Sequence, residues 1–405
     1  MRVLFADAVD PSTLEALGAL GHRCEADASI SAEDLPERIG GVEVLVVRST
    51  RVTAAAIEAA HDLELIIRAG AGTNTIDVDA ASEVGIYVTN VPGRNAIAVA
   101  ELTIGLLLAI DRRIADNVAD LRSGAWNKSE YAKADGLFGK RLGIVGLGDI
   151  GLAVAERARA FGLDLVAVRK DREPDVEERI KALGVELVGS LEELVSSSDV
   201  VSIHVPAAPE TEGLFDARLL GMMREGAILL NTSRGDVVDG SALLDAIEER
   251  GIRVGLDVYP DEPASGAAEW SSKLAQHPNV VGTHHIGAST GQAQRAVADG
   301  VVEIVEAFAR GEVLNCVNLA PRSLGTHSLH IRHYDRVGVL ARVFDELRRR
   351  GLNVEQMQNR VFRGGNAAVA TIDVVGDVGP DLLSTLEELP DVLHVSASPV
   401  EGSER

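Results

Sequence analysis

An arginine, a carboxylate and a histidine follow three successive predicted strands in the middle of the chain. Arg234, Glu262 and His285 stand in the segments NTSRG, DVYPDEP and THHIGAST, each just past an apolar run. Because parallel strands end at one edge of their sheet, we expect the three side chains to meet there. An arginine fork can hold a carboxylate, a histidine exchanges protons near neutral pH, and a carboxylate on its other ring nitrogen orients it. Each segment alone could be a helix cap, a turn or a satisfied histidine, but together, beside a nicotinamide site, they would suit hydride transfer between a 2-keto acid and a 2-hydroxy acid.

A glycine-rich turn upstream predicts a dinucleotide site. The stretch from Leu142 to Arg169 has the pattern of strand, turn, helix and strand. In such a unit Gly146 allows the tight turn, Gly148 lets the backbone approach a pyrophosphate, and Gly151 lets helix and strand pack closely. The pyrophosphate would bind the free N–H groups at the start of the helix; a purely structural glycine turn is the alternative. The turn consists of Gly146, Leu147, Gly148, Asp149, Ile150 and Gly151.

The position that should select the cofactor departs from the usual pattern. The fingerprint predicts an acidic residue at the end of the second strand, where it would hold the ribose hydroxyls of NAD. This chain has Arg169 there, followed by Lys170, Asp171 and Arg172. Arg169 could pair with the 2′-phosphate of NADP, Asp171 could reach the ribose of NAD, or the charges could belong to a surface loop. We therefore predict NAD or NADP as the cofactor.

Composition and charge exclude several classes of partner. With 405 residues the chain should hold two or three domains. Its net charge of −23 argues against nucleic acid and anionic membranes as partners. No apolar run reaches the roughly 20 residues needed to span a bilayer, and the N-terminus has the pattern of a strand rather than a signal peptide, so we expect a cytoplasmic protein. Cys24 and Cys316 stand far apart without other ligand residues, so we predict neither a disulfide nor a metal site.

The first 90 residues alternate short apolar runs with helical patterns, which predicts an open α/β sheet. Ligands gather at the carboxyl ends of the strands in such sheets. Those ends carry the segments Arg48 to Arg51 and Arg68 to Asn74, which mix cations, hydroxyls and glycines with free backbone N–H groups. We interpret them as a cradle for an anion. A small anionic substrate would need such a cluster of arginines inside the negative field of the protein.

Two long helical patterns connect this sheet to a second one. Asn95 to Ile114 leads into the second sheet, and Gln292 to Arg310 can carry the chain back. Two sheet domains joined in this way would leave a cleft between them. After a linker from Ala320 to Gly325, the pattern from His327 to Ala397 predicts the element order βαββαβ, which is that of a ferredoxin-like module. The edges of so small a sheet tend to pair with a second copy.

These motifs, in this order, resemble one enzyme family. VGLGDIG, NTSRGDVVDG, LDVYPDEP and HHIGAST resemble the D-isomer-specific 2-hydroxyacid dehydrogenases. VVRSTRVT, IIRAGAGTNTID and NVPGRNAIAVAE resemble the substrate domain of the family's 3-phosphoglycerate dehydrogenase branch, and the C-terminal part resembles an ACT domain. The resemblance implies oxidation of D-3-phosphoglycerate to 3-phosphohydroxypyruvate with NAD(P), a step of L-serine biosynthesis. It implies a flavodoxin-like substrate domain (residues 1–98 and 287–320), a Rossmann nucleotide domain (99–286) and an ACT regulatory domain (326–405).

The resemblance also assigns roles position by position. It makes Arg234, Glu262 and His285 the catalytic residues; His284 stands where family members usually have proline, and Ile286-Gly287 identify His285 as the catalytic histidine. Asp257 matches the aspartate that holds the nicotinamide amide, and Thr232 would lie beside the ring. Cofactor binding is thus expected of Gly146, Gly148, Asp149, Ile150, Gly151, Arg169, Thr232 and Asp257, and substrate binding of Arg48, Arg51, Arg68, Gly72, Thr73 and Asn74.

The ACT resemblance implies an amino-acid effector site between two copies. His333, Asp335 and Asn353 occupy the places of the family's serine-binding residues. Bacterial serine-sensing enzymes have Asn where this chain has Asp335, and Val337 replaces the usual proline, so a purely structural oligomerisation module is the alternative. Pairing through the first crossing helix and through the ACT edges predicts a homodimer or homotetramer.

Two other functions fit the same pattern. An NADP-dependent hydroxypyruvate or glyoxylate reductase is favoured by Arg169 and disfavoured by the ACT domain. A non-enzymatic nucleotide-sensing co-repressor on the same fold is disfavoured by the intact set of Arg234, Glu262 and His285.

Overall fold

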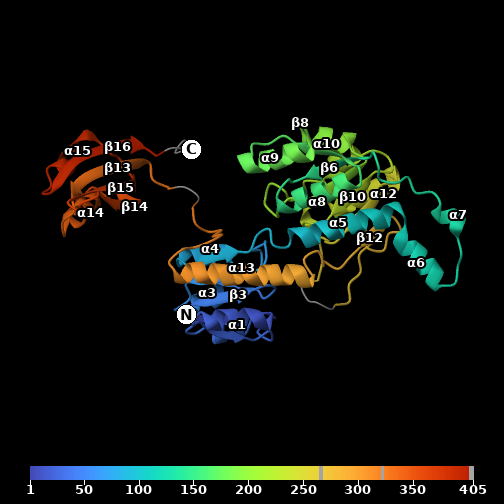
Figure 1. Cartoon of the computed structure of the whole chain (residues 1–405), viewed down its shortest axis with the longest axis horizontal. Helices are drawn as coiled ribbons and strands as arrows, with labels where there is room; N and C mark the ends of the chain where they lie inside the picture. Colours follow the sequence, from blue (N-terminus) through green and yellow to red (C-terminus); the bar gives the residue numbers. More distant parts are fainter. Residues whose placement is uncertain (264–267, 321–322, 401–405) are drawn as a thin grey trace. The chain divides into compact units, whose positions relative to one another are not determined.

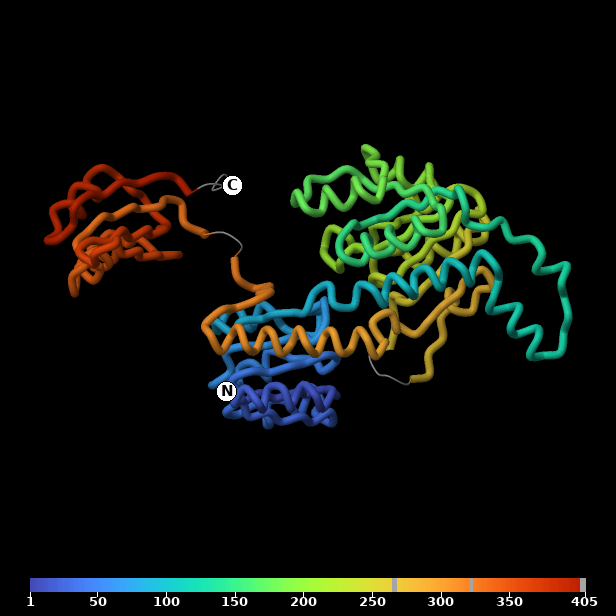
Figure 2. The backbone as a smooth tube through the Cα atoms, in the orientation of Figure 1, coloured from blue at the N-terminus to red at the C-terminus, as the bar shows by residue number. Residues whose placement is uncertain are grey.

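The chain forms two compact units, Met1–Asn318 and Leu319–Arg405. The structure is a computed structural model that describes residues 1–263, 268–320 and 323–400 (Figures 1 and 2). Residues 321–322 of the predicted linker and 401–405 of the predicted C-terminal domain lie outside the described residues. In the described part of the chain, no helix is both long and apolar enough to cross a membrane.

The first unit begins with a five-stranded parallel sheet in the order β2-β1-β3-β4-β5. Apolar side chains of the central strands alternate between two buried clusters, one on each face. Helices α1 and α13 cover one face, and α2, α3 and α4 cover the other. The strands are β1 (Arg2–Phe5), β2 (Arg23–Ala26), β3 (Val44–Val47), β4 (Leu65–Arg68) and β5 (Tyr87–Asn90); the helices are α1 (Pro11–Ala19), α2 (Leu35–Arg38), α3 (Ala54–Glu58), α4 (Val78–Glu83) and α13 (Gly291–Ala309).

A seven-stranded parallel sheet follows, in the order β12-β11-β10-β9-β6-β7-β8. The chain leaves β6 towards β7 and β8 and then returns to β9 on the other side of β6, so the strand order reverses between β6 and β9. Ligands of open α/β sheets bind at such a switch point. The strands are β6 (Arg141–Val145), β7 (Asp164–Val168), β8 (Glu186–Val188), β9 (Val200–Ile203), β10 (Ile228–Asn231), β11 (Arg253–Leu256) and β12 (Val280–Gly282).

Helices cover both faces of this second sheet. One face packs on α5 (Ala96–Asp111), α8 (Asp149–Ala160) and α9 (Pro174–Leu183), and the other on α10 (Leu191–Ser197), α11 (Ala217–Gly221) and α12 (Gly240–Arg250). The two crossing helices are therefore confirmed: α5 leaves the first sheet and packs on the second, and α13 returns to the first (Figure 2).

Several elements escaped the sequence analysis because they carry little buried apolar surface. The edge strand β2 has no fully buried residue. The segment from Asp116 to Gly139 contains most of α6 (Ile114–Arg122) and all of α7 (Lys128–Tyr131), neither of which buries a side chain. Figure 1 shows both helices reaching away from the second sheet.

The C-terminal unit has the predicted βαββαβ order and an antiparallel sheet, β14-β15-β13-β16. Helices α14 and α15 bury the inner face of this sheet in one apolar cluster. The edge strand β14 is exposed along its whole length except at the half-buried Val354. The elements are β13 (His327–Tyr334), α14 (Val339–Arg349), β14 (Asn353–Val361), β15 (Ala367–Val375), α15 (Pro380–Glu387) and β16 (Val392–Pro399).

Candidate active site

The glycine turn after β6 has the geometry that its spacing predicts. Gly146 has a φ of +101°, and a Cβ on it would lie 2.5 Å from the carbonyl oxygen of His204. A Cβ on Gly151 would overlap the carbonyl oxygen of Gly146, whereas one on Gly148 would meet no atom within 4 Å. Gly148 is also the N-cap of α8. Because glycine has no side chain that could cap the helix, the first N–H groups of α8 are left for an anion. The turn therefore fits a dinucleotide pyrophosphate.

Two alanine substitutions in this turn should separate an effect on stability from an effect on cofactor binding. Gly151→Ala pushes a methyl group into the Gly146 carbonyl, so we expect the free protein to lose about 1–3 kcal/mol of stability. Gly148→Ala adds a methyl group in open space, so the free protein should melt like the wild type while its affinity for NAD(H) falls several-fold. Thermal melts and NADH fluorescence titrations measure both effects. Equal melting temperatures for Gly151→Ala and the wild type would contradict the close packing.

The end of β7 carries cations rather than the usual carboxylate. Arg169 is exposed, and its Nη2 makes one long hydrogen bond, of 3.5 Å, to the carbonyl oxygen of Leu187. Arg172, which was not among the predicted cofactor-binding residues, folds back over the strand end and donates to the carbonyl oxygens of Val168 and Lys170, both at 3.0 Å. These two hydrogen bonds hold the Arg172 guanidinium against the carboxyl end of β7.

His285 and Glu262 form a directly bonded pair. Nδ1 of His285 lies 2.5 Å from Oε1 of Glu262, and the backbone N–H of Tyr259 donates to Oε2 of Glu262 at 3.2 Å. The imidazole is 48% exposed, so its other nitrogen remains accessible to a substrate. Burial alone would raise the pKa of Glu262, but the hydrogen bond and charge of His285, the Tyr259 N–H and the charge of Arg234 together lower it. Glu262 therefore stays ionised and can stabilise a positively charged imidazole.

Asp257 is hydrogen-bonded to the loop that carries His285 and is almost fully buried. Its Oδ1 accepts hydrogen bonds from the Thr283 hydroxyl (2.5 Å) and the Ile286 N–H (2.9 Å), and its Oδ2 accepts one from the Gly287 N–H (2.8 Å). A Cβ on Gly287 would lie 3.0 Å from Oδ2, which is why glycine suits this position. The carboxylate predicted to hold the nicotinamide amide thus already organises the histidine loop.

Arg234 extends from the end of β10 and is fixed by its neighbours. The buried Asn231 donates to the carbonyl oxygen of Arg234 at 2.8 Å and accepts from the N–H of Ser233 at 3.0 Å. The next residue, Gly235, packs so tightly on Tyr259 that a Cβ would overlap its carbonyl carbon. The guanidinium reaches the first sheet, because a Cβ on Gly72 would lie 2.5 Å from Nη2 of Arg234.

The charges of Arg48, from the first sheet, and Arg234, from the second, both act on Arg68. Burial, together with the charges of Arg234 and Arg48, lowers the pKa of Arg68 to about 10. Arg68 is still a cation at neutral pH, so the cluster holds excess positive charge. Among the residues that the structure describes, Asp7 alone opposes this shift of the Arg68 pKa. A bound anion would relieve the repulsion.

One feature of the predicted anion cradle is wrong. The backbone N–H groups at the end of β3 are not free, because the carboxylate of Asp7, just past β1, accepts from Arg48 (2.6 Å), Ser49 (3.1 Å) and Thr50 (3.1 Å). Consecutive N–H groups bind a carboxylate wherever one is within reach. An anionic substrate must therefore be held by side chains at this strand end.

The remaining predicted residues lie close to this cluster or at its edge. Thr232 is buried, and its hydroxyl pairs with that of Thr103 on α5 at 2.9 Å. Gly72 contacts Arg234 and lies near the Asn74 side chain, while Thr73 between them is half-buried. Arg51 is exposed, and no hydrogen bond of its side chain to the described residues joins it to the cluster.

Within one chain, the structure separates the three predicted effector residues. His333 pairs with Ala368 near the start of β15, whereas Asn353 pairs with Val375 at its end. His333 is buried, with Nδ1 at 2.8 Å from the carbonyl oxygen of Tyr334 and Nε2 at 3.2 Å from Oδ1 of Asn359. Asp335 follows β13 at the His333 end.

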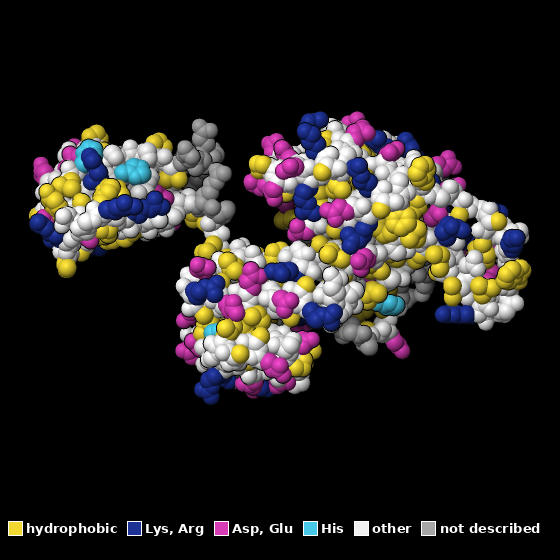
Figure 3. Space-filling model, in the orientation of Figure 1, with side chains coloured by type: hydrophobic (Ala, Val, Ile, Leu, Met, Phe, Trp, Pro, Cys, Tyr) yellow, Lys and Arg dark blue, Asp and Glu magenta, His cyan; other side chains and the backbone are white. Residues whose placement is uncertain are grey.

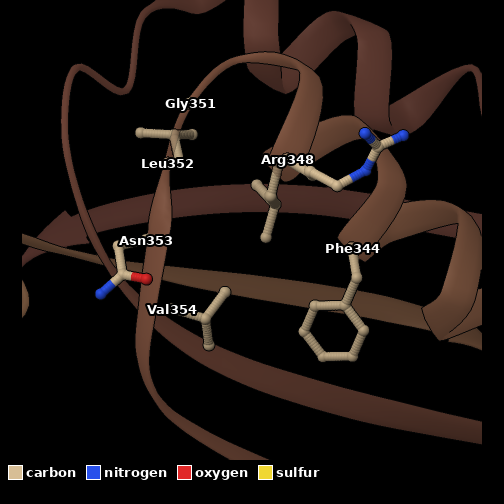
Figure 4. Close-up of a pocket in the computed structure, with 7 residues that line it drawn as sticks. Phe344, Arg348, Gly351, Leu352, Asn353 and Val354 are labelled. Atoms are coloured by element: carbon tan, nitrogen blue, oxygen red, sulfur yellow. The ribbon is translucent and has the colours of Figure 1, made fainter.

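Asn353 lines a shallow pocket at the other end of the sheet. Phe344 and Arg348 of α14 form one side of this pocket, and Leu352 and Val354 form the other (Figure 4). The three predicted effector residues therefore do not form a common pocket in a single chain.

Comparison with known proteins identifies the family. Residues 104–287 match the family described as "D-isomer specific 2-hydroxyacid dehydrogenase, NAD binding domain". D-3-phosphoglycerate dehydrogenase of Methanocaldococcus jannaschii is 38% identical over 80% of this chain and 61% of its own length. Hydroxypyruvate reductase of Thermotoga maritima is 41% identical over 73% of this chain and 94% of its own length. The crystal structure of the TT0316 protein of Thermus thermophilus superposes with a TM-score of 0.68, at 35% identity over 78% of this chain and all of that one.

The chain belongs to the D-isomer specific 2-hydroxyacid dehydrogenase family. The fold predicted from the sequence and the prediction of a nicotinamide dinucleotide cofactor are both confirmed at the level of the family. The chain spans only about 60% of the length of the phosphoglycerate dehydrogenase relatives that it matches.

Proposed function

We propose that the chain is a D-3-phosphoglycerate dehydrogenase, which oxidises D-3-phosphoglycerate to 3-phosphohydroxypyruvate with NAD(P) in L-serine biosynthesis, in the cytoplasm. The observation that carries the proposal is the cluster of Arg48, Arg68 and Arg234 close to the bonded pair of His285 and Glu262. A substrate with both a carboxylate and a phosphate supplies two anions to a site that holds three cations. Shorter hydroxy acids supply only one.

The reaction assigns one task to each of these groups. Arg234 holds the substrate carboxylate and polarises the C2 oxygen, and Arg48 and Arg68 hold the phosphate. When bound, the nicotinamide ring of NAD(P) would supply the acceptor for the hydride of C2. Nε2 of His285 takes the proton of the C2 hydroxyl, while Glu262 on Nδ1 stabilises the resulting imidazolium. In the reductive direction the same proton returns to the alkoxide.

The test of this function is a comparison of substrates. D-3-phosphoglycerate is oxidised with NAD and with NADP, and the reduction of 3-phosphohydroxypyruvate, hydroxypyruvate and glyoxylate is measured in parallel. We expect kcat/KM for 3-phosphohydroxypyruvate to exceed that for hydroxypyruvate by about 10–100-fold. This is the typical contribution of one charge-assisted hydrogen bond, here to the phosphate. Equal values for the two, or a preference for the unphosphorylated acid, would contradict the proposal.

A second candidate is an NADP-dependent hydroxypyruvate or glyoxylate reductase. It is favoured by the cations at the end of β7 and by the likeness to the Thermotoga maritima enzyme named hydroxypyruvate reductase. A third candidate, a nucleotide-sensing co-repressor without enzymatic activity, requires tight nucleotide binding with no turnover of any short 2-keto acid. The bonded pair of His285 and Glu262 argues against this candidate, because a protein without enzymatic activity does not need a histidine placed for proton transfer.

The cations at the end of β7 lead to a prediction about the cofactor. We expect NADP to be used at least as well as NAD, because Arg169 and Arg172 can each donate to a 2′-phosphate. Replacing both by alanine should raise the KM for NADP by about 10–100-fold and change that for NAD by less than about threefold. Arg179→Ala is the matched control, since this exposed arginine on α9 pairs with Glu156. Unchanged kinetics with NADP in the double variant would contradict the prediction.

The same proposal includes assembly into a homodimer or homotetramer. Ile114, Val118 and Leu121 recur at helical spacing on α6 and are all exposed, and Trp126 after them is 80% exposed. Hydrophobic side chains on this projecting segment are visible in Figure 3. A second copy would cover such a surface. Sedimentation that shows only monomers would contradict this assembly.

An amino-acid effector such as serine at His333, Asp335 and Asn353 also remains a proposal. The separation of these residues in one chain supports a site that two copies share. Titration calorimetry with serine, together with inhibition assays, tests it; absence of both heat and inhibition leaves the C-terminal unit with an oligomerisation role alone.

A further inference from the structure

The histidine loop has an unusual backbone conformation. His285 has a φ of +52°, in the left-handed region, which costs an L-residue with a Cβ of the order of 1–2 kcal/mol. The loop follows β12, and the Thr283 N–H still donates to the carbonyl oxygen of Leu256 at 2.9 Å, as in a regular sheet. The chain turns sharply at the next residues. A conformation of this kind persists only where the surroundings impose it.

Asp257 supplies that constraint. The N–H groups of three consecutive residues point at it: that of His285 donates to its backbone carbonyl (2.8 Å), and those of Ile286 and Gly287 donate to its carboxylate. Successive N–H groups converge on an anion when the backbone alternates between right- and left-handed conformations. The left-handed conformation of His285 is therefore what lets its loop wrap around the Asp257 carboxylate.

Thr283 completes the arrangement from the other side. Its hydroxyl donates to Oδ1 of Asp257, which also accepts from Ile286. A carboxylate offers about four acceptor positions, and the residues described in the structure fill three of those on Asp257. The position that remains is on Oδ2, so the carboxylate can bind one further donor without releasing the loop.

We propose that Thr283 and Asp257 act as positioning residues for His285: they clamp its backbone in the left-handed conformation and thereby keep Nδ1 on Glu262. The inference rests on the proposed function, in which Nε2 of His285 carries the proton. The fourth acceptor position of Asp257 would face a donor of the cofactor, so cofactor and histidine loop would share one carboxylate. Loss of the Thr283 hydroxyl would loosen the loop without removing any group that touches the substrate.

The test compares Thr283→Val, which removes the hydroxyl at nearly constant volume, with Thr283→Ser, which keeps it. We expect Thr283→Val to lower kcat by about 10–100-fold, as misplacement of a catalytic group does. The KM for the cofactor should stay within about twofold, and the pH profile of kcat should shift. Thr283→Ser should restore the wild-type values. Thr283→Ala gives a second version of the experiment if the valine variant does not fold.

A spectroscopic measurement on the free protein makes the test independent of turnover. The ring nitrogens of His285 are observed by NMR in protein labelled with 15N-histidine and assigned by their loss in His285→Gln. In Thr283→Val the Nδ1 signal should lose the shift of a strong hydrogen bond to a carboxylate, and in Thr283→Ser it should keep it. An unchanged His285 signal and unchanged kcat in Thr283→Val would overturn the inference. A wild-type protein that oxidises no 2-hydroxy acid would refute the proposed function instead, while the NMR comparison still decides the clamp.

Discussion

Replacing His285 by alanine should lower kcat by about three orders of magnitude and leave the Kd for NADH within about twofold. The reason is that the imidazole is the group placed to move the proton, since Nδ1 is held by Glu262 and the ring is half-exposed. Stopped-flow turnover and NADH fluorescence titration measure the two quantities. His284→Ala is the matched control: this neighbouring histidine is exposed, and no side-chain hydrogen bond joins it to the described residues. A larger loss in His284→Ala than in His285→Ala would mean that the wrong histidine has been assigned.

The partner carboxylate adds a pH dependence to this prediction. The pKa of Glu262 is lowered in the folded protein, so its interactions stabilise the fold at pH values above its ordinary pKa and are lost as the pH falls through the folded value. Glu262→Gln should therefore be less stable than the wild type at neutral pH and equally stable in acid. Thermal melts at pH 7 and in acid well below the ordinary pKa of a glutamate measure the difference. A constant difference at both pH values would show that the carboxylate charge is not involved.

Replacing Arg234 by lysine should lower kcat/KM by about 10²–10³-fold. Lysine keeps the charge but loses the planar fork that can grip a carboxylate and polarise the adjacent oxygen. The Asn231 hydrogen bonds that fix this strand end involve backbone groups of Ser233 and Arg234, so they survive the substitution. The affinity for NADH should hardly change. Steady-state kinetics with 3-phosphohydroxypyruvate and a binding titration check both points.

The matched control for Arg234→Lys is Arg51→Lys. The sequence motifs assign Arg51 to substrate binding, but in the structure it is exposed and not bonded to the described residues of the cluster. This substitution should change kcat/KM by less than about threefold. If Arg51→Lys were as damaging as Arg234→Lys, a closed form of the protein would have to bring Arg51 into the site, and the geometry described here would not be the reactive one.

The sequence predicted much of the fold because its signals are local. Continuous apolar runs marked the buried parallel strands, and the glycine turn has the tight bend, open approach and close packing that its three glycines implied. The strand β2 and the helices α6 and α7 lack a buried apolar side, so the periodicity of apolar residues does not predict them. The division of the first unit into residues 1–98 plus 287–320 and 99–286 stays a prediction.

The candidate site was predictable only in part. The rule that ligand-binding residues follow parallel strands placed Arg234, Glu262 and His285 near the same edge. It did not reveal that Asp7, which also follows a strand, accepts hydrogen bonds from the N–H groups that an anion was expected to use. Such a contact joins residues about 40 positions apart, and no pattern along the chain specifies it. The hydroxyl of Thr283 escaped attention for the same reason, because its partner lies 26 residues away.

The separation of His333 from Asn353 has a consequence for stoichiometry. The two residues pair with positions seven residues apart on β15, which corresponds to about 24 Å along an extended strand. A free amino acid is far shorter than this, so a ligand that contacts both ends must bridge two chains. If the chains are related by a two-fold axis, each bridging site has an equivalent on the opposite side of the axis. Saturation would then occur at one ligand per chain, and diluting the protein until the copies separate would abolish binding altogether.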